Sequence, residues 1–175
     1  MRRSLSFFFF LVILILAVVD ADNVEDTCQK ASQNIKELPY DFCVAVLGEN
    51  PKSHSADLQS LGIISIELIE ANCTKVSSRI AELLNDKKLV RDVKIRLEDC
   101  KELYSNAIDQ VKPAIDAFKS KDYKSANIEV SAMMEAPTTC EDGFKEEPGL
   151  QSPLVAEDNY FFQLTSIALA ITTFA

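Results

Sequence analysis

Five cysteines are the residues of this chain with the clearest capacity for chemistry. Cys100 and Cys140 each lie in an apolar series that steps by alternating three and four residues, which is typical of the buried seam of a bundled helix. The midpoint of the two cysteines is residue 120, within the polar segment 119–122. A helical hairpin that turns there would bring both sulfurs to one level, so a Cys100–Cys140 disulfide is one pairing that the spacing allows. The two series are Val90, Val93, Leu97, Cys100, Tyr104, Ala107, Val111 and Tyr123, Ala126, Val130, Met133, Pro137, Cys140, Phe144.

Patterns that would support catalysis or metal binding are sparse. His54 is the single histidine and has no cysteine or carboxylate at ligand spacing, whereas a structural zinc site needs about four such ligands. The sequence contains no Gly-x-Ser-x-Gly, phosphate-binding glycine loop or His-Glu-x-x-His. Adjacent carboxylates such as Glu98–Asp99 and Glu141–Asp142 point apart on a helix, so we interpret both pairs as solvated faces. We therefore expect no catalytic residue, no metal site and no cofactor.

The N-terminus has the pattern of a secretory signal peptide. Arg2 and Arg3 precede an apolar run at 7–19, and small residues near Ala21 fit a cleavage site. The run is shorter than the ~20 residues of a membrane-spanning helix, which disfavours the alternative of a membrane anchor. We predict a signal peptide at 1–21, a secreted mature chain at 22–175 and no membrane attachment after cleavage.

Secretion favours disulfides, and five cysteines leave one unpaired. Cys28 and Cys43 flank a break at Pro39 and could close a short hairpin. Cys73 lies on a seam of its own, and the midpoint of Cys73 and Cys100 falls in the polar segment 85–88. A Cys73–Cys100 disulfide therefore competes with Cys100–Cys140, and spacing alone does not choose between them.

The charge of the mature chain limits its partners. Without Arg2, Arg3 and Asp20 it holds 16 basic and 26 acidic residues, a net charge of −10. This charge disfavours nucleic acid and anionic membranes and suits a basic protein partner. Simple solubility explains the charge equally well.

The periodicity predicts an all-α fold. Glycine is scarce, with 4 residues in 175, and no segment shows sustained period-two alternation. Two short helices around Pro39 form an N-terminal hairpin at 22–50, and four longer helices occupy 51–175. The first two longer helices are expected from Ser53 or Ser55 to residue 84 and at 88–118, where Pro113 predicts a kink or an early end near Lys112. The other two are expected at 122–144, with an irregularity at Pro137, and at 152–175. Short polar breaks make neighbours antiparallel, which gives a disulfide-linked, up-down-up-down four-helix bundle.

Two further features have alternative interpretations. The apolar tail at 160–175 could be the removable signal of a lipid anchor, but Gln163, Thr165, Ser166 and the seam periodicity favour a bundle helix. Asn72-Cys73-Thr74 matches the N-glycosylation pattern. Asn72 is therefore a candidate glycosylation site, although the cysteine and the mid-helix position both weaken the signal.

Several segments make the chain resemble the plant invertase and pectin methylesterase inhibitor family. The most specific are Asp-Cys-x-x-x-Tyr at 99–104 and Thr-Cys-Glu-Asp-Gly-Phe at 139–144. Residues 28–43, 51–58 and Ser152-Pro153 add to the similarity, which spans the whole mature chain. The resemblance implies the hairpin-plus-bundle fold, disulfides Cys28–Cys43 and Cys100–Cys140, and Cys73 as a free thiol.

The same resemblance implies a protein that inhibits enzymes and catalyses nothing itself. Inhibitors of invertase typically carry Pro-Lys-Phe after the second bundle helix, where this chain has Lys121-Asp122-Tyr123. Inhibitors of pectin methylesterase often have Asp-Tyr there. Candidate contacts are therefore Lys121, Asp122 and Tyr123, together with acidic side chains of the second and third bundle helices.

The function expected from the resemblance is inhibition in the plant cell wall, the apoplast. The chain would occlude the active-site cleft of a cell-wall or vacuolar invertase (beta-fructofuranosidase). A pectin methylesterase is the alternative target. A further alternative is a structural or allergenic pollen protein with no enzyme target.

Overall fold

The computed structural model describes residues 23–175, which form an all-helical structure without strands. The predicted signal peptide at 1–21 lies outside the described residues. The elements are α2 (Asn23–Asn34), α3 (Tyr40–Gly48), the 3₁₀ turn η1 (Ser53–Ser55), α4 (Leu58–Leu84), α5 (Arg91–Asp109), α6 (Val111–Lys119), α7 (Tyr123–Lys145) and α8 (Val155–Phe174). The predicted all-α class is confirmed.

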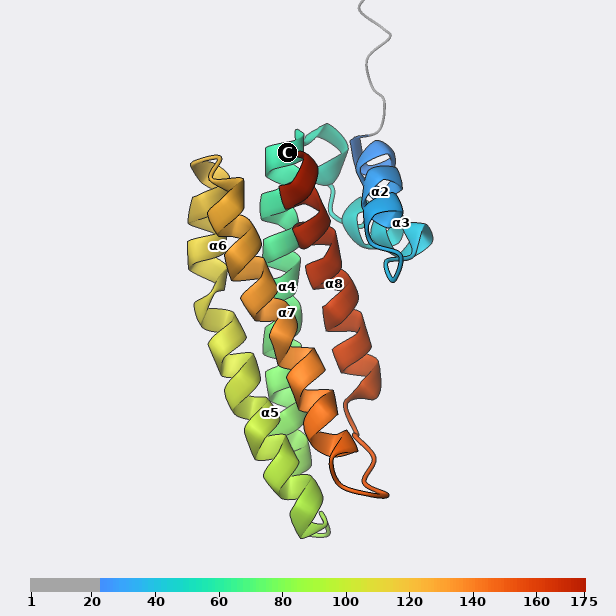
Figure 1. The fold of residues 1–175 in the computed structure, drawn as a ribbon, viewed down its shortest axis with the longest axis vertical. Helices are drawn as coiled ribbons and strands as arrows, with labels where there is room; N and C mark the ends of the chain where they lie inside the picture. The colour runs from blue at the N-terminus through green and yellow to red at the C-terminus, as the bar shows by residue number, and fades with distance from the viewer. Residues whose placement is uncertain (1–22) are drawn as a thin grey trace, which may run out of the picture.

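A four-helix bundle forms the body of the molecule, and a helical hairpin lies beside one end of it. α5 and α6 follow one another along one wall, and α4, α7 and α8 supply the other three (Figure 1). The α2–α3 hairpin packs mainly on α8 and also contacts α4. The predicted seams are buried from Leu97 to Val111 and from Ala126 to Phe144, whereas Val90 is 62% exposed and does not belong to the core. Burial of this apolar surface, at ~25 cal/mol per Å², is the main stabilising contribution.

The first bundle helix begins later than the sequence predicted. Asp57 caps α4, because its carboxylate accepts a hydrogen bond from the Ser60 amide at 2.8 Å. Ser53 and Ser55 lie in η1 instead, and extended backbone at Ala56 separates that turn from α4. The prediction that Ser53 or Ser55 caps the helix was wrong. A carboxylate close to the first apolar turn is an equally good capping residue.

The second bundle helix is divided in two. α5 ends at Asp109 and α6 begins at Val111, so the break at Gln110 precedes Pro113 by three residues. Proline removes one amide donor and clashes with the carbonyl four residues earlier, which here belongs to Asp109. In the first turn of α6 that missing donor has no cost. By contrast, α7 continues through Pro137 without ending.

The structure contains the two disulfides that the resemblance implied. Cys28 and Cys43 link α2 to α3 with their Cα atoms 5.5 Å apart, and Cys100 and Cys140 link α5 to α7 with a Cα separation of 4.9 Å. Cys73 is a free, buried thiol in α4. Its sulfur donates a hydrogen bond to the Tyr104 carbonyl at 3.2 Å, so Cys73 contacts α5 without replacing Cys140 as the partner of Cys100.

The apolar C-terminal tail supplies the fourth wall of the bundle. Leu164, Ala168 and Ile171 of α8 are at most 2% exposed, and α8 packs against α4 and α7. Within residues 23–175, none of the helices combines the length and the hydropathy needed to cross a bilayer.

Candidate protein-binding surface

The three predicted contact residues lie together at the turn between α6 and α7. Lys121 and Asp122 are exposed, whereas Tyr123 is only half-buried. Asp122 caps α7, since its carboxylate accepts hydrogen bonds from the Ser125 amide at 3.1 Å and the Ser125 hydroxyl at 2.7 Å. These hydrogen bonds hold the pKa of Asp122 below its ordinary value. The turn therefore presents one basic and one acidic side chain to solvent.

Contacts from the bundle hold this turn in one conformation. The Tyr123 ring meets the edge of the buried Phe118 ring, with centroids 5.8 Å apart. The side-chain amide of Gln59, on α4, donates hydrogen bonds to the carbonyls of Phe118 at 2.7 Å and Lys119 at 3.1 Å. Lys121 itself has a positive φ of 59°, which reverses the chain sharply. A preorganised turn of this kind loses little conformational entropy when a partner binds.

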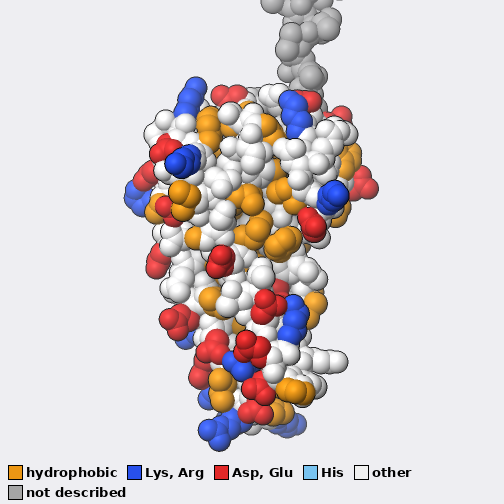
Figure 2. Space-filling view, in the orientation of Figure 1, with side chains coloured by type: hydrophobic (Ala, Val, Ile, Leu, Met, Phe, Trp, Pro, Cys, Tyr) orange, Lys and Arg blue, Asp and Glu red, His pale blue; other side chains and the backbone are white. Residues whose placement is uncertain are grey.

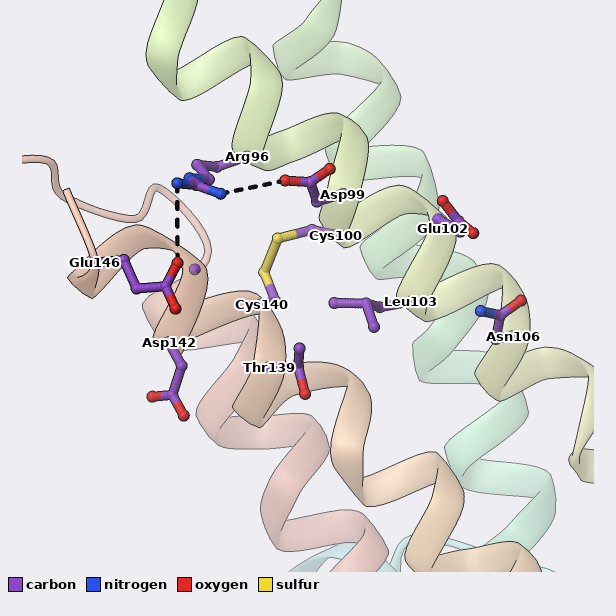
Figure 3. A pocket seen from close by; sticks show the side chains of 11 residues that line it. Arg96, Asp99, Cys100, Glu102, Leu103, Asn106, Thr139, Cys140, Asp142 and Glu146 are labelled. Carbon is purple, nitrogen blue, oxygen red and sulfur yellow. Dashed lines mark ion pairs between the residues drawn. A yellow bond between two sulfur atoms is a disulfide. The ribbon is translucent and has the colours of Figure 1, made fainter.

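A groove between α5 and α7 runs along the same wall of the bundle. The Cys100–Cys140 disulfide lies within it, with Leu103 and Thr139 beside the sulfurs (Figure 3). The groove has a volume of about 360 Å³. Its remaining lining is mostly polar and comes from Arg96, Asp99, Glu102 and Asn106 on one side and Asp142, Gly143 and Glu146 on the other.

The charge of this groove is predominantly negative. Arg96 is the single cation in its lining and lies 3.6 Å from Asp99 and 4.0 Å from Glu146 (Figure 3). Arg96 also contacts Glu147 at 3.2 Å, so its charge is fully matched. In the orientation of Figure 1, acidic side chains gather over the half of the bundle away from the hairpin, and Lys or Arg side chains lie at its tip (Figure 2). The acidic side chains of α5 and α7 that line this groove therefore share one surface, and their contact with a target stays a prediction.

The structure does not assemble an obvious catalytic centre from the residues that the sequence singled out. His54 is exposed on η1, away from the groove residues just described. Among residues 23–175, the one group close enough to hold a metal ion comprises Cys140, Glu141 and Asp158. Cys140 is bonded to Cys100, so its sulfur is not a free thiolate and the group offers only two ligands.

A buried polar cluster lies behind the groove, and the sequence analysis missed it. The Tyr104 hydroxyl donates a hydrogen bond to Oδ1 of Asp158, which is 2% exposed. The Tyr104 ring also meets the Phe161 ring edge-on at 5.1 Å. Burial, followed by the neighbouring Glu141, raises the pKa of Asp158 to about 8.

Glu141 corrects one sequence interpretation. Glu141 is half-buried, and its Oε1 atom is buried without a hydrogen-bond partner, so one carboxylate oxygen of Glu141 points away from the solvated face that was predicted. Asp142, Glu98 and Asp99 are exposed, in agreement with that interpretation. The sequence did contain a signal for this cluster. Asp158 falls between Leu154 and Phe161 at helical spacing, which places a carboxyl group on the apolar seam of α8.

Asn72 lies in the middle of α4 and is half-buried. Its side-chain oxygen is buried and unpartnered, in a hollow also lined by Val76 and Tyr160. Glycosylation at Asn72 remains a prediction.

Comparison with known proteins agrees with this architecture. The family model described as plant invertase/pectin methylesterase inhibitor matches residues 22–171. The chain is 48% identical over 175 residues to the protein named "Putative invertase inhibitor" of Platanus acerifolia, an alignment that covers 98% of this chain and 97% of the relative. It is 37% identical over 134 residues to the "Pectinesterase inhibitor" of Actinidia deliciosa, with 75% and 70% covered.

A solved structure shows the same fold. The crystal structure of mutant form A of a pectin methylesterase inhibitor from Arabidopsis superposes with a TM-score of 0.69 at 25% sequence identity, and the superposition covers 83% of this chain and 96% of that one. The match in fold and the family match over most of the sequence lead to one conclusion. The chain belongs to the plant invertase/pectin methylesterase inhibitor family.

Proposed function

We propose that this chain is a secreted, non-catalytic inhibitor of a plant cell-wall carbohydrate enzyme and that its target is an invertase. The observation that carries the proposal is the 48% identity, over nearly the full length of both chains, to a relative named as an invertase inhibitor. The rigid turn at Lys121–Tyr123 and the acidic α5–α7 groove supply a surface suited to occlusion of a cleft. A 1:1 complex would bury ~1,600 Å² in total.

Pectin methylesterase is the second candidate target, and the turn itself favours it. Asp122-Tyr123 stands where invertase inhibitors of the better-known type carry Pro-Lys-Phe. A relative named as a pectinesterase inhibitor shares 37% identity with this chain over 134 residues. The turn and the overall similarity therefore favour different enzymes, and an inhibition assay is needed to choose between them.

The assay mixes the oxidised mature protein with a purified cell-wall invertase and, separately, with a pectin methylesterase. We expect inhibition of the invertase that weakens as salt increases, because charge pairs contribute to the complex. Inhibition of pectin methylesterase alone would assign the second target. Inhibition of neither enzyme at micromolar excess would overturn the proposal and favour a structural pollen protein without an enzyme target.

Variants of the surface test where the enzyme binds. Tyr123→Phe keeps the ring on Phe118 and removes only the hydroxyl, whereas Tyr123→Ala also removes the ring. Glu102→Lys reverses one charge of the groove, and Lys87→Glu in the α4–α5 turn is the matched control outside it. We expect Tyr123→Ala and Glu102→Lys to raise the inhibition constant at least tenfold and Lys87→Glu to leave it unchanged. Equal inhibition by all variants would exclude this surface.

A further inference from the structure

Two carboxyl groups meet between α7 and α8, in a hollow that shares no lining residue with the α5–α7 groove. Asp158 on α8 accepts a hydrogen bond from Tyr104 through Oδ1, but its Oδ2 is buried without a partner. Oε1 of Glu141 on α7 is likewise buried and unpartnered. Carboxylate oxygens of the two residues lie within 4.8 Å of each other. Two acceptors thus face one another where neither has a donor.

A single proton resolves this arrangement. Two ionised carboxylates would repel across a short, poorly hydrated distance, and each would retain an unsatisfied acceptor. A proton held between Oδ2 of Asp158 and Oε1 of Glu141 turns one acceptor into a donor and satisfies both atoms. We propose that Asp158 and Glu141 share one proton, which joins α7 to α8 and makes the folded bundle less stable as the solution becomes more alkaline.

The groups around the pair do not supply a compensating positive charge. Tyr104 from α5 is a neutral donor whose pKa is raised by burial and by Asp158. Cys73 from α4 contacts the Tyr104 carbonyl and stays a neutral thiol, since burial raises its pKa to about 12. Both groups are therefore uncharged throughout the ordinary pH range, and neither can neutralise a second carboxylate.

The nearest charged residues on α7 and α8 have other partners. Lys145 lines the same hollow as the carboxyl pair, but its ammonium contacts Asp142 at 2.9 Å. Glu157 adds a negative charge that further favours protonation of Asp158, and Arg79 of α4 contacts Glu157 at 3.7 Å. The hollow is open to solvent at Thr138 and Asn159, which gives protons a route to the pair.

The direction of the pH effect follows from linkage. Burial and then Glu141 raise the pKa of Asp158 from 3.8 to about 8 on folding, so the folded chain binds one proton more than the unfolded chain between those values. This stabilisation is complete below the unfolded pKa and is lost as the pH rises through the folded one. Within that window the folding equilibrium constant falls up to about tenfold per pH unit.

Denaturation at several pH values tests the proposal without any target enzyme. In Asp158→Asn the side-chain amide can donate to Glu141 as the protonated acid does, but it has no proton to lose. We expect the folding constant of the unaltered protein to fall steadily from about pH 5 to about pH 8. The folding constant of Asp158→Asn should be flat over this range, and an unchanged slope in that variant would overturn the proposal.

A second variant and a direct measurement keep the test decisive where Asp158→Asn fails to fold. Glu141→Gln removes the second carboxyl group and supplies an amide donor to Asp158, so it should make the pH slope shallower, while the burial of Asp158 persists. Glu98→Gln, which replaces an exposed carboxyl on α5, is its matched control and should retain the slope. The infrared band of a protonated carboxyl group should be present near neutral pH and weaker in Glu141→Gln. Its absence in the unaltered protein, or stabilisation by added Ca²⁺ in its place, would refute a shared proton.

Discussion

Gly62 of α4 and Phe118 of α6 are in contact so close that no side chain fits between them. A Cβ atom on Gly62 would lie 2.2 Å from Cε1 of the Phe118 ring, which is fully buried. Phe118 in turn supports the Tyr123 ring and accepts a hydrogen bond from Gln59 through its carbonyl. Because Gly62 has no side chain, the Phe118 ring can pack against α4 and support the turn that carries the candidate contacts.

Substitution of this glycine should destabilise the bundle. Gly62→Ala forces Phe118 out of its position, and overpacking of this kind costs about 1–3 kcal/mol. Gly48→Ala is the control, because a Cβ atom on Gly48 meets nothing within 4 Å and alanine at an unstrained site is neutral or stabilising by up to about 1 kcal/mol. Urea denaturation measures both free energies of unfolding. Similar values for the two variants would contradict the contact described here.

The disulfide between α5 and α7 should contribute more to stability than the one in the hairpin. Cys100 and Cys140 are separated by 40 residues, whereas Cys28 and Cys43 are separated by 15. In the chain-entropy model these loops correspond to about 4 and about 3 kcal/mol of stabilisation. Paired replacement by alanine, followed by chemical denaturation, compares the two. A larger loss from the hairpin pair would show that strain or residual unfolded structure dominates instead.

The hydrophobic seams were predictable because helical periodicity requires only the order of apolar residues. Helix ends were less predictable, since several nearby residues can cap a helix equally well. Asp57 competes with Ser53 and Ser55 as a cap on sequence grounds, and only the extended backbone at Ala56 decides between them. Pro113 correctly indicated an interruption, but its steric conflict acts four residues earlier and placed the break at Gln110.

The candidate site was predictable where it depends on local sequence and unpredictable where it depends on packing. The Lys121–Tyr123 turn follows from a polar break between two helical series. The contact between Glu141 and Asp158 depends on how α7 and α8 are rotated against each other, which neither helix encodes alone. Periodicity places Asp158 on a buried seam, but it does not reveal which polar group faces it.

Cys73 should be unreactive in the folded protein. Its thiol is buried against the Tyr104 carbonyl, and burial raises its pKa to about 12. Because the thiolate is the reactive form, iodoacetamide should not modify the native protein at about pH 8 but should add one label in denaturant. Mass spectrometry of the unreduced protein counts the labels added under native and under denaturing conditions. Rapid labelling without denaturant, or a Cys73–Cys100 peptide, would contradict the disulfide arrangement.

Among residues 23–175, Lys121 is the one non-glycine residue whose backbone is left-handed, with a φ of 59°. Such a conformation costs an ordinary L-residue roughly 1–2 kcal/mol, and glycine avoids that cost but loses about 0.5–1 kcal/mol through its freer unfolded chain. Lys121→Gly should therefore raise the free energy of unfolding by about 0.5–1 kcal/mol, measured by urea denaturation. Lys119→Gly, two residues earlier in the right-handed end of α6, should lower it by up to about 1 kcal/mol.

The pair of variants also separates strain from binding. If the Lys121 ammonium contacts the target enzyme, Lys121→Gly should be more stable than the unaltered protein and yet inhibit less well. Lys119→Gly should show the opposite combination, with lower stability and an unchanged inhibition constant. A gain in stability with full inhibition would mean that the strained backbone at Lys121 serves the sharp reversal between α6 and α7 and that its side chain makes no contact with the enzyme.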